Sequence, residues 1–258
     1  MSATDNASDA RIVLACLDLT SLNDDDDTAA IDMLCAQAIG PAGRGWPAAV
    51  CVWPRFVAHA RVMLPAAIRV AAVANFPAGN LDLGFALYDT HAILDAGGDE
   101  VDLVLPWRAM QAGDMRGAAA LVAAVRAACI GKTLKLIIES GCLTPEQIDK
   151  ACVIGLDAGA DFLKTSTGKT AYGASTGAAQ RMLARIAGHR RRHEVGFKAS
   201  GGVRTVTDAV NYIALSRQVL GDTAVGPARL RFGASGLLAD LETVLGFGAG
   251  TSDLHQRH

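Results

Sequence analysis

The chain has 258 residues, of which 51% are hydrophobic and 5% aromatic, and its net charge is −2 at pH 7. This length and apolar content suit a large buried core. The near-neutral charge, with no basic block beyond Arg190 to Arg192, argues against binding to nucleic acid or to a membrane surface.

We expect a soluble cytoplasmic protein. The six cysteines have no CxxC spacing and lie mostly in apolar stretches, which favours reduced thiols over disulfides. The chain opens without a charged and apolar leader, and no apolar run approaches the ~20 residues that span a bilayer.

Short apolar runs recur at intervals of roughly 30 residues, each followed by a helical pattern, as in parallel βαβ units. We predict strands at residues 12–17, 49–53, 68–74, 100–105, 134–139, 161–164, 194–198 and 230–234. The helical spacing is clearest at 118–129 and 177–189, and Thr144-Pro145-Glu146 is typical of a helix start. Eight such units with short connections predict a single-domain (β/α)8 TIM barrel over residues 11–247, between flexible segments at 1–10 and 248–258.

The chemistry of such a barrel lies at the carboxyl ends of its strands. The polar residues at those ends are Asp18, Thr20, Cys51, Asn75, Asp102, Lys135, Glu139, Lys164 to Thr167, Lys198, Ser200 and Ser235. Only six of the 24 Lys and Arg residues are lysines, so arginine carries the ordinary surface charge. Lysine, unlike arginine, can lose its proton in a desolvated site and attack a carbonyl carbon. The lysines at strand ends therefore indicate chemistry.

Lys164 and Lys198 close adjacent predicted strands. Two ammonium groups ~6 Å apart at an effective dielectric constant of ~20 repel by about 3 kcal/mol, roughly two pKa units, which leaves one a free amine near neutral pH. Asp102 is a single carboxylate in an apolar run and needs a cationic or hydrogen-bonding partner. The residues leave open whether Asp102 only forms a structural ion pair with Lys135 or Lys198, whether Lys164 is a surface lysine, and which lysine is the nucleophile.

Three segments that follow predicted strands fit a phosphate group, because backbone N–H groups at such turns and helix starts bind anions. They are Ser166-Thr167-Gly168-Lys169, Gly201-Gly202-Val203-Arg204 and Gly233-Ala234-Ser235-Gly236. Gly168-Lys169-Thr170 imitates the end of a nucleotide-binding P-loop, but Leu163 stands where that motif requires its first glycine. No HxH or HExxH motif occurs, so we expect neither a metal nor another cofactor.

The chain resembles the deoxyribose-phosphate aldolase family from Leu14 to Leu245. The segments that carry the resemblance are LDLTSLNDDDDT (17–28), AVCVWPRF (49–56), NFPAGN (75–80), DEVDLVLPWRAMQAG (99–113), LKLIIESG (134–141), GADFLKTSTGKT (159–170), VGFKASGGVRT (195–205) and RFGASGLL (231–238).

The resemblance implies a metal-free class I aldolase on a (β/α)8 barrel, which reversibly cleaves 2-deoxy-D-ribose 5-phosphate to D-glyceraldehyde 3-phosphate and acetaldehyde. It implies that Lys164 is the Schiff-base lysine, that Lys198 lowers the pKa of Lys164 and shares in proton transfer, and that Asp102 relays protons through a water. It also implies a substrate and phosphate site made of Asp18, Thr20, Thr167, Gly168, Lys169, Gly201, Gly202, Val203, Arg204, Ala234 and Ser235.

The sequence also departs from some members of this family. Gly236 stands where some relatives have a second serine, Lys198 precedes Ala-Ser where some carry Pro-Ala, and the tail lacks a tyrosine. Two alternatives stay open: another phosphosugar barrel enzyme, of the transaldolase or isomerase type, and a non-catalytic sugar-phosphate sensor. The expected partners are a phosphorylated deoxy-sugar and small aldehydes, with a homodimer as an open expectation.

Overall fold

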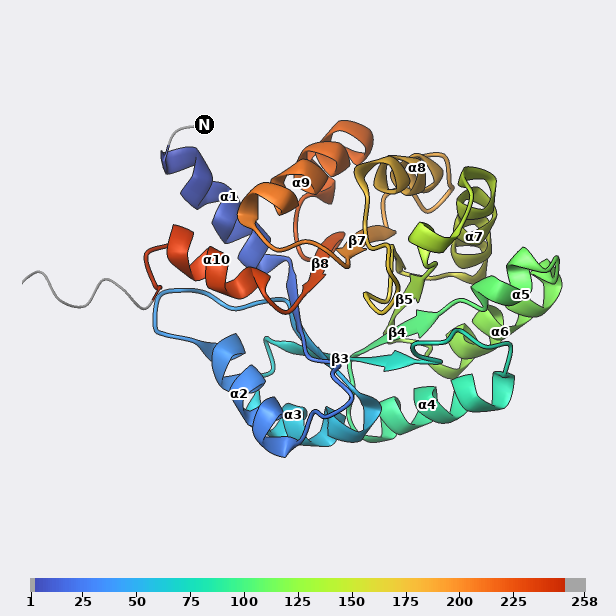
Figure 1. Cartoon of the computed structure of the whole chain (residues 1–258), viewed down its shortest axis with the longest axis horizontal. Helices are drawn as coiled ribbons and strands as arrows, with labels where there is room; N and C mark the ends of the chain where they lie inside the picture. Colours follow the sequence, from blue (N-terminus) through green and yellow to red (C-terminus); the bar gives the residue numbers. More distant parts are fainter. Residues whose placement is uncertain (1–2, 249–258) are drawn as a thin grey trace, which may run out of the picture.

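Eight parallel strands close into a barrel in the order β1 to β8, with β8 paired to β1, and helices surround them (Figure 1). This computed structural model describes residues 3–248. The strands are β1 (Leu17–Thr20), β2 (Ala49–Val52), β3 (Arg69–Ala74), β4 (Glu100–Val104), β5 (Thr133–Ile137), β6 (Phe162–Lys164), β7 (Gly196–Ser200) and β8 (Leu230–Ala234). The predicted single-domain (β/α)8 barrel is confirmed.

The outer layer consists of α-helices and short 3-10 turns. The α-helices are α1 (Ala3–Ala15), α2 (Thr28–Ile39), α3 (Val57–Met63), α4 (Leu83–Asp95), α5 (Trp107–Gln111), α6 (Met115–Ala128), α7 (Pro145–Ala158), α8 (Thr176–Ala187), α9 (Val206–Leu220) and α10 (Leu237–Val244). The 3-10 turns are η1 (Pro54–Phe56), η2 (Ser140–Cys142) and η3 (Asp222–Ala224). Within residues 3–248, no helix is long and apolar enough to cross a membrane.

Side-chain caps define where many of these helices begin. The caps of α2, α4, α6, α7, α8 and α9 each accept a hydrogen bond from a backbone N–H in the first turn. Thr144 and Thr205 form full capping boxes with Gln147 and Asp208. The predicted start at Thr144-Pro145 is therefore confirmed, with proline in the first turn, where its missing N–H costs nothing.

The first strand is the main difference from the sequence-based boundaries. Residues 12–15 belong to α1, and β1 begins only at Leu17. Ala10, Val13 and Leu14 are buried at helical spacing, and α1 packs against α9 and α10. A short apolar run does not by itself distinguish a helix from a strand, and here tertiary packing selects the helix. Residues 1–10 are accordingly helical from Ala3 on, and most of the predicted flexible tail, 249–258, lies outside the described residues.

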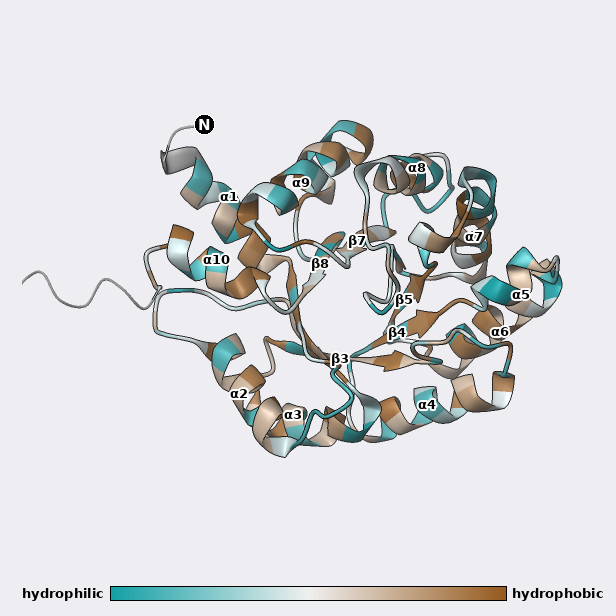
Figure 2. Cartoon of the chain, in the orientation of Figure 1, coloured by the Kyte–Doolittle hydropathy of each residue, from teal (hydrophilic) through white to brown (hydrophobic). Residues whose placement is uncertain are grey.

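Two kinds of packing position the site. One apolar core lies between the strands and the helices, and Figure 2 shows hydrophobic residues along the strands and on the helix faces turned toward them. A second apolar cluster fills one side of the barrel interior, with Cys51, Ala71, Val73 and Ile137 among its members. The other side of the interior is charged. All six cysteines are free, and five of them are buried.

Candidate active site

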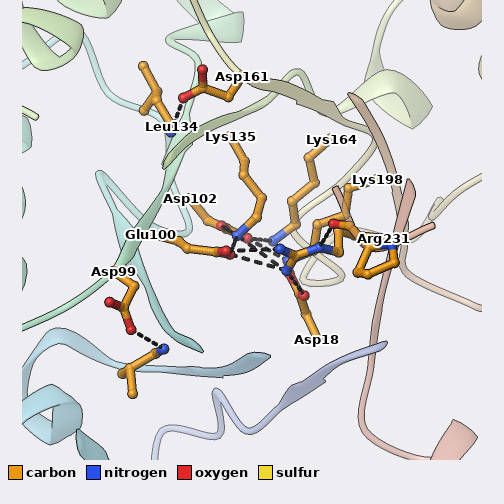
Figure 3. Close-up of polar contacts among 12 residues, drawn as sticks. Asp18, Asp99, Glu100, Asp102, Leu134, Lys135, Asp161, Lys164, Lys198 and Arg231 are labelled. Carbon is orange, nitrogen blue, oxygen red and sulfur yellow. Dashed lines mark hydrogen bonds and ion pairs between the residues drawn. The ribbon is translucent and has the colours of Figure 1, made fainter. Parts of the chain in front are cut away.

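Seven charged side chains meet inside the barrel, all of them at most 7% exposed (Figure 3). They are Asp18 on β1, Glu100 and Asp102 on β4, Lys135 on β5, Lys164 on β6, Lys198 on β7 and Arg231 on β8. The barrel register places Asp102 beside Lys135, Lys164 beside Lys198, and Lys198 beside Arg231. Inward-facing positions of neighbouring strands thus bring together residues far apart in the sequence. We call this set the ion cluster.

Asp102 is the central carboxylate of the ion cluster. Its Oδ2 accepts hydrogen bonds from the Nζ atoms of Lys164 and Lys198, each at 2.8 Å, and its Oδ1 accepts one from Lys135 at 2.7 Å. Burial alone would raise the pKa of Asp102, but Lys135, Lys164 and Lys198 together hold that pKa well below its usual range. The prediction that Asp102 has a cationic partner is confirmed, and it has three.

Glu100 and Arg231 complete the ion cluster, and the sequence analysis missed both. The Arg231 guanidinium donates to Asp18 Oδ1 at 2.6 Å and to Glu100 Oε1 at 2.9 Å. Lys135 Nζ lies 2.5 Å from Glu100 Oε2. The signal was present in the alternation, since Glu100 is two residues before Asp102 and Arg231 two residues before Gly233, so both face the same way as those inward positions.

Of the two strand-end lysines, Lys198 is the one whose positive charge is better neutralised by nearby carboxylates. Its Nζ donates to Asp18 Oδ2 at 2.5 Å and to Asp102 Oδ2 at 2.8 Å. Burial would lower the pKa of Lys198, but the carboxylates of Asp102 and Asp18 raise it above its ordinary value. Gly233 leaves room for this side chain, because a Cβ at 233 would lie 3.0 Å from Lys198 Cε. The contacts of Lys198 with Asp18 and Asp102 therefore favour its protonated form.

For Lys164, the effects that lower the pKa outweigh those that raise it. Within residues 3–248, Lys164 contacts one carboxylate oxygen, Asp102 Oδ2, and shares that oxygen with Lys198. Burial lowers the pKa of Lys164, and the charge of Lys198 lowers it further, against the carboxylate of Asp102. Lys164 is 3% exposed, so the interpretation of it as a surface lysine is wrong. The structure thus separates the two lysines, which the residues alone could not do, and makes Lys164 the amine that loses its proton more readily.

A pocket of about 280 Å³ opens above Lys164 at the carboxyl end of the barrel, and Lys164 is the member of the ion cluster that lines it. Its wall comes from the carboxyl ends of β1, β7 and β8 and from the segments after β1, β6, β7 and β8: Thr20, Leu22, Asn23, Thr167, Gly168, Lys169, Ser200, Gly201, Gly202, Val203, Arg204, Gly233, Ala234 and Ser235. Ten of the eleven residues predicted for the substrate and phosphate site are in this wall. The exception is Asp18, which is fully buried in the ion cluster beneath the pocket.

Backbone N–H groups at the pocket wall are available to an anion. Among the described residues, no hydrogen-bond acceptor is found for the N–H groups of Gly168, Gly202, Val203 and Ser235 in the wall, nor for that of Gly236, which directly follows the wall. Gly168 and Gly202 have positive φ values of 78° and 93°, a conformation that glycine adopts without strain. Gly236 also precedes the first turn of α10, where the helix dipole favours negative charge.

Glu139 supports the wall segment after β6, a role that the sequence did not reveal. Its carboxylate is fully buried and accepts hydrogen bonds from the Thr167 N–H at 3.3 Å, the Thr167 hydroxyl at 2.6 Å and the Thr170 hydroxyl at 3.2 Å. Glu139 itself has a φ of 55°, a left-handed conformation that is uncommon outside glycine. Thr167 lines the pocket, but its backbone N–H and its hydroxyl both donate to Glu139 and not to the pocket.

Comparisons with known proteins agree with this geometry. Residues 12–242 match the profile of the DeoC/LacD family aldolase. A protein of Coccidioides immitis, provisionally named deoxyribose-phosphate aldolase, is 30% identical, with a TM-score of 0.78 over 89% of this chain and 85% of that one. A Toxoplasma gondii ME49 protein with the same provisional name is 22% identical, with a TM-score of 0.85 over 96% and 99% of the two chains. The tetrameric deoxyribose phosphate aldolase of Aeropyrum pernix is 21% identical, with a TM-score of 0.69 over 94% and 98%. The last two show the fold alone.

Proposed function

The chain belongs to the DeoC/LacD family of aldolases, and within that family we propose that it is a class I deoxyribose-phosphate aldolase. It reversibly cleaves 2-deoxy-D-ribose 5-phosphate to D-glyceraldehyde 3-phosphate and acetaldehyde in the cytoplasm, as a step in deoxyribonucleotide catabolism. One observation carries the proposal: Lys164 is the cation of the ion cluster that lines the pocket, and among the described residues it contacts a single, shared carboxylate oxygen.

Lys164 supplies the nucleophile. In its neutral form, Nζ attacks the C1 aldehyde carbon of the open-chain sugar, and loss of the resulting C1 hydroxyl as water gives a protonated imine. The C3 hydroxyl then gives up its proton and the C2–C3 bond breaks. Its electron pair forms the C1=C2 bond of an enamine, while the C1=N π pair moves to the nitrogen. D-Glyceraldehyde 3-phosphate leaves, protonation at C2 of the enamine restores the imine, and hydrolysis releases acetaldehyde and free Lys164.

Lys198 and Asp102 move the protons. The raised pKa of Lys198 keeps an ammonium group beside Lys164, which holds Lys164 neutral and provides a proton when the C1 hydroxyl leaves. Asp102, with a depressed pKa, stays a carboxylate that accepts from both lysines, and it relays protons through a water to the departing C1 hydroxyl and to C2 of the enamine. The direct contacts among the three groups support this division of roles.

The phosphate occupies the outer part of the pocket. Its oxygens accept from the N–H groups of Gly202, Val203 and Ser235, with Lys169 and Arg204 supplying positive charge nearby. This arrangement follows the general pattern of barrels, which bind phosphate on the loops after their last two strands. Phosphate binding at one end and Lys164 at the other fix which carbon meets the amine.

Borohydride trapping tests the proposal. Acetaldehyde and sodium borohydride should leave an ethyl group on Lys164, located by peptide mapping, and a Lys164→Arg control should stay unmodified. An unmodified Lys164 in the native protein would contradict the mechanism. Release of acetaldehyde from 2-deoxyribose 5-phosphate then separates this aldolase from a transaldolase or isomerase, and from a sugar-phosphate sensor, which releases no product.

A further inference from the structure

We propose that Glu100 and Arg231 are positioning residues of this reaction, which fix the ion cluster in the arrangement that leaves Lys164 as its least-compensated cation. The inference rests on the proposed function, because it concerns the protonation state in which Lys164 attacks its substrate. Neither side chain lines the pocket, so each acts through its neighbours in the cluster.

Arg231 directs Asp18 toward Lys198. The planar guanidinium occupies Asp18 Oδ1 at 2.6 Å, which leaves Asp18 Oδ2 for the Lys198 ammonium at 2.5 Å, with Lys135 Nζ farther away at 3.4 Å. Asp18 is fully buried and Arg231 is 7% exposed, so water does not replace this contact. Arg231 thus secures the second carboxylate that Lys198 has and Lys164 lacks.

Glu100 acts on the other side, through Lys135. Its carboxylate contacts Lys135 at 2.5 Å and Arg231 at 2.9 Å, so one side chain of β4 binds both cations. Held in this way, Lys135 occupies Asp102 Oδ1 at 2.7 Å. Asp102 Oδ2 is then the one oxygen of that carboxylate left for Lys164 and Lys198 together.

The charges of the cluster lead to the same conclusion. Four cations face three carboxylates, so the cluster is balanced when Lys164 is neutral. Without Arg231, the remaining positive and negative charges of the cluster would be equal when Lys164 is protonated. Without Glu100, the excess of positive charge would increase. Because unbalanced buried charge is costly, the two changes should move the protonation of Lys164 in opposite directions.

No other described titratable group changes this sign. The titratable and charged groups around Lys164 in the barrel interior are Asp18, Cys51, Glu100, Asp102, Lys135, Lys198 and Arg231. Lys169 and Arg204 in the pocket wall, and Glu139 behind it, are the same in every variant proposed below. Cys51 is fully buried, and burial raises the pKa of its thiol, so it stays neutral while Lys164 titrates.

The pH dependence of kcat/KM for 2-deoxyribose 5-phosphate tests the proposal, because its acid limb reports the free enzyme's essential base. Arg231→Met should move that limb to higher pH and Glu100→Gln to lower pH, each by roughly one unit, the size expected of one buried charge. The double variant should return toward the wild-type position. Arg229→Met is the matched control, because Arg229 is a similarly buried arginine whose side chain, among the described residues, donates to the backbone oxygens of Arg192 and Val195. The acid limb of this variant should not move.

Two further measurements keep the outcomes distinct. Lys135→Met removes another cation from the cluster and should also move the acid limb to higher pH. This variant keeps the inference testable if circular dichroism shows that Arg231→Met or Glu100→Gln does not fold. Limbs that stay at the wild-type position, or that move in the same direction in both single variants, would overturn the inference. Failure of the wild-type protein to form the Lys164 adduct with acetaldehyde would instead overturn the proposed function.

Discussion

Lys164 and Lys198 donate to the same atom, Asp102 Oδ2, from 2.8 Å each, and yet their pKa values shift in opposite directions. The difference lies in Asp18, which contacts Lys198 and not Lys164. One additional carboxylate thus separates an ammonium group that keeps its proton from an amine that gives it up.

We predict that Lys198→Arg folds but loses at least two orders of magnitude in kcat. Arginine keeps the charge between Asp18 and Asp102, but it does not release a proton in this pH range and its head group needs more space beside Gly233. Steady-state kinetics, with circular dichroism as the check on folding, measure the effect. Wild-type turnover in this variant would remove Lys198 from the mechanism.

Gly236→Ser should strengthen phosphate binding. Gly236 has a φ of −87°, and a Cβ built there meets no atom within 4 Å, so serine fits without strain. A hydroxyl at the start of α10 adds a donor beside the phosphate, worth about 1 kcal/mol or roughly a fivefold lower KM for the phosphorylated substrate. Gly226→Ser is the control, because position 226 is equally open but precedes β8, at the opposite end of the strand. An unchanged KM in Gly236→Ser would place the phosphate elsewhere.

Glu139→Gln should weaken phosphate binding without affecting imine formation. The neutral amide cannot accept from Thr167 N–H, the Thr167 hydroxyl and the Thr170 hydroxyl together, so the segment that carries Gly168 loses its support. We expect roughly a tenfold higher KM for 2-deoxyribose 5-phosphate, equal to about 1.4 kcal/mol, and no change for unphosphorylated 2-deoxyribose. Glu146→Gln, a change at an exposed acid, is the control. Equal effects on both substrates would contradict this role.

The protein should lose stability as the pH falls below about 4. Asp18 and Asp102 have folded-state pKa values below the ordinary 3.8, because their buried cations outweigh burial. Their contribution is fully present above the unfolded-state pKa and is lost as the pH falls from there through the folded-state values. Urea midpoints measured between pH 7 and pH 3 should show the loss at both low and high salt, since buried pairs are screened little. A midpoint that is constant over this range would contradict the prediction.

The sequence predicted those parts of the site that depend on local pattern. Strand ends could be read from apolar alternation, so Lys164, Lys198 and Asp102 were found, and Gly-rich segments after three strands marked the pocket wall. The family resemblance implied that Asp18 belongs to the substrate and phosphate site, whereas it lies in the ion cluster. Strand ends indicate which residues converge, but the depth of each side chain follows from the register across the barrel.

Other features depended on contacts between distant segments. Arg231 and Glu100 are 131 residues apart, and nothing local to either predicts their contact. Glu139 supports residues Thr167 to Thr170, which follow the next strand, β6. Residues 12–15 are helical because α9 and α10 pack against the helix that contains them. Such relationships are set by tertiary structure, which periodicity in one segment does not report.

The pairing of β1 with β8 has a consequence for folding. These strands lie at opposite ends of the chain, and the Asp18 to Arg231 contact joins them inside the barrel. Bringing such distant segments together costs loop-closure entropy, which the contacts at this seam must offset. A barrel still open at this seam would lack the Asp18 contact that holds the charge on Lys198, so closure of the barrel and activation of Lys164 are one event. A partly folded chain would carry the lysine but not its reactivity.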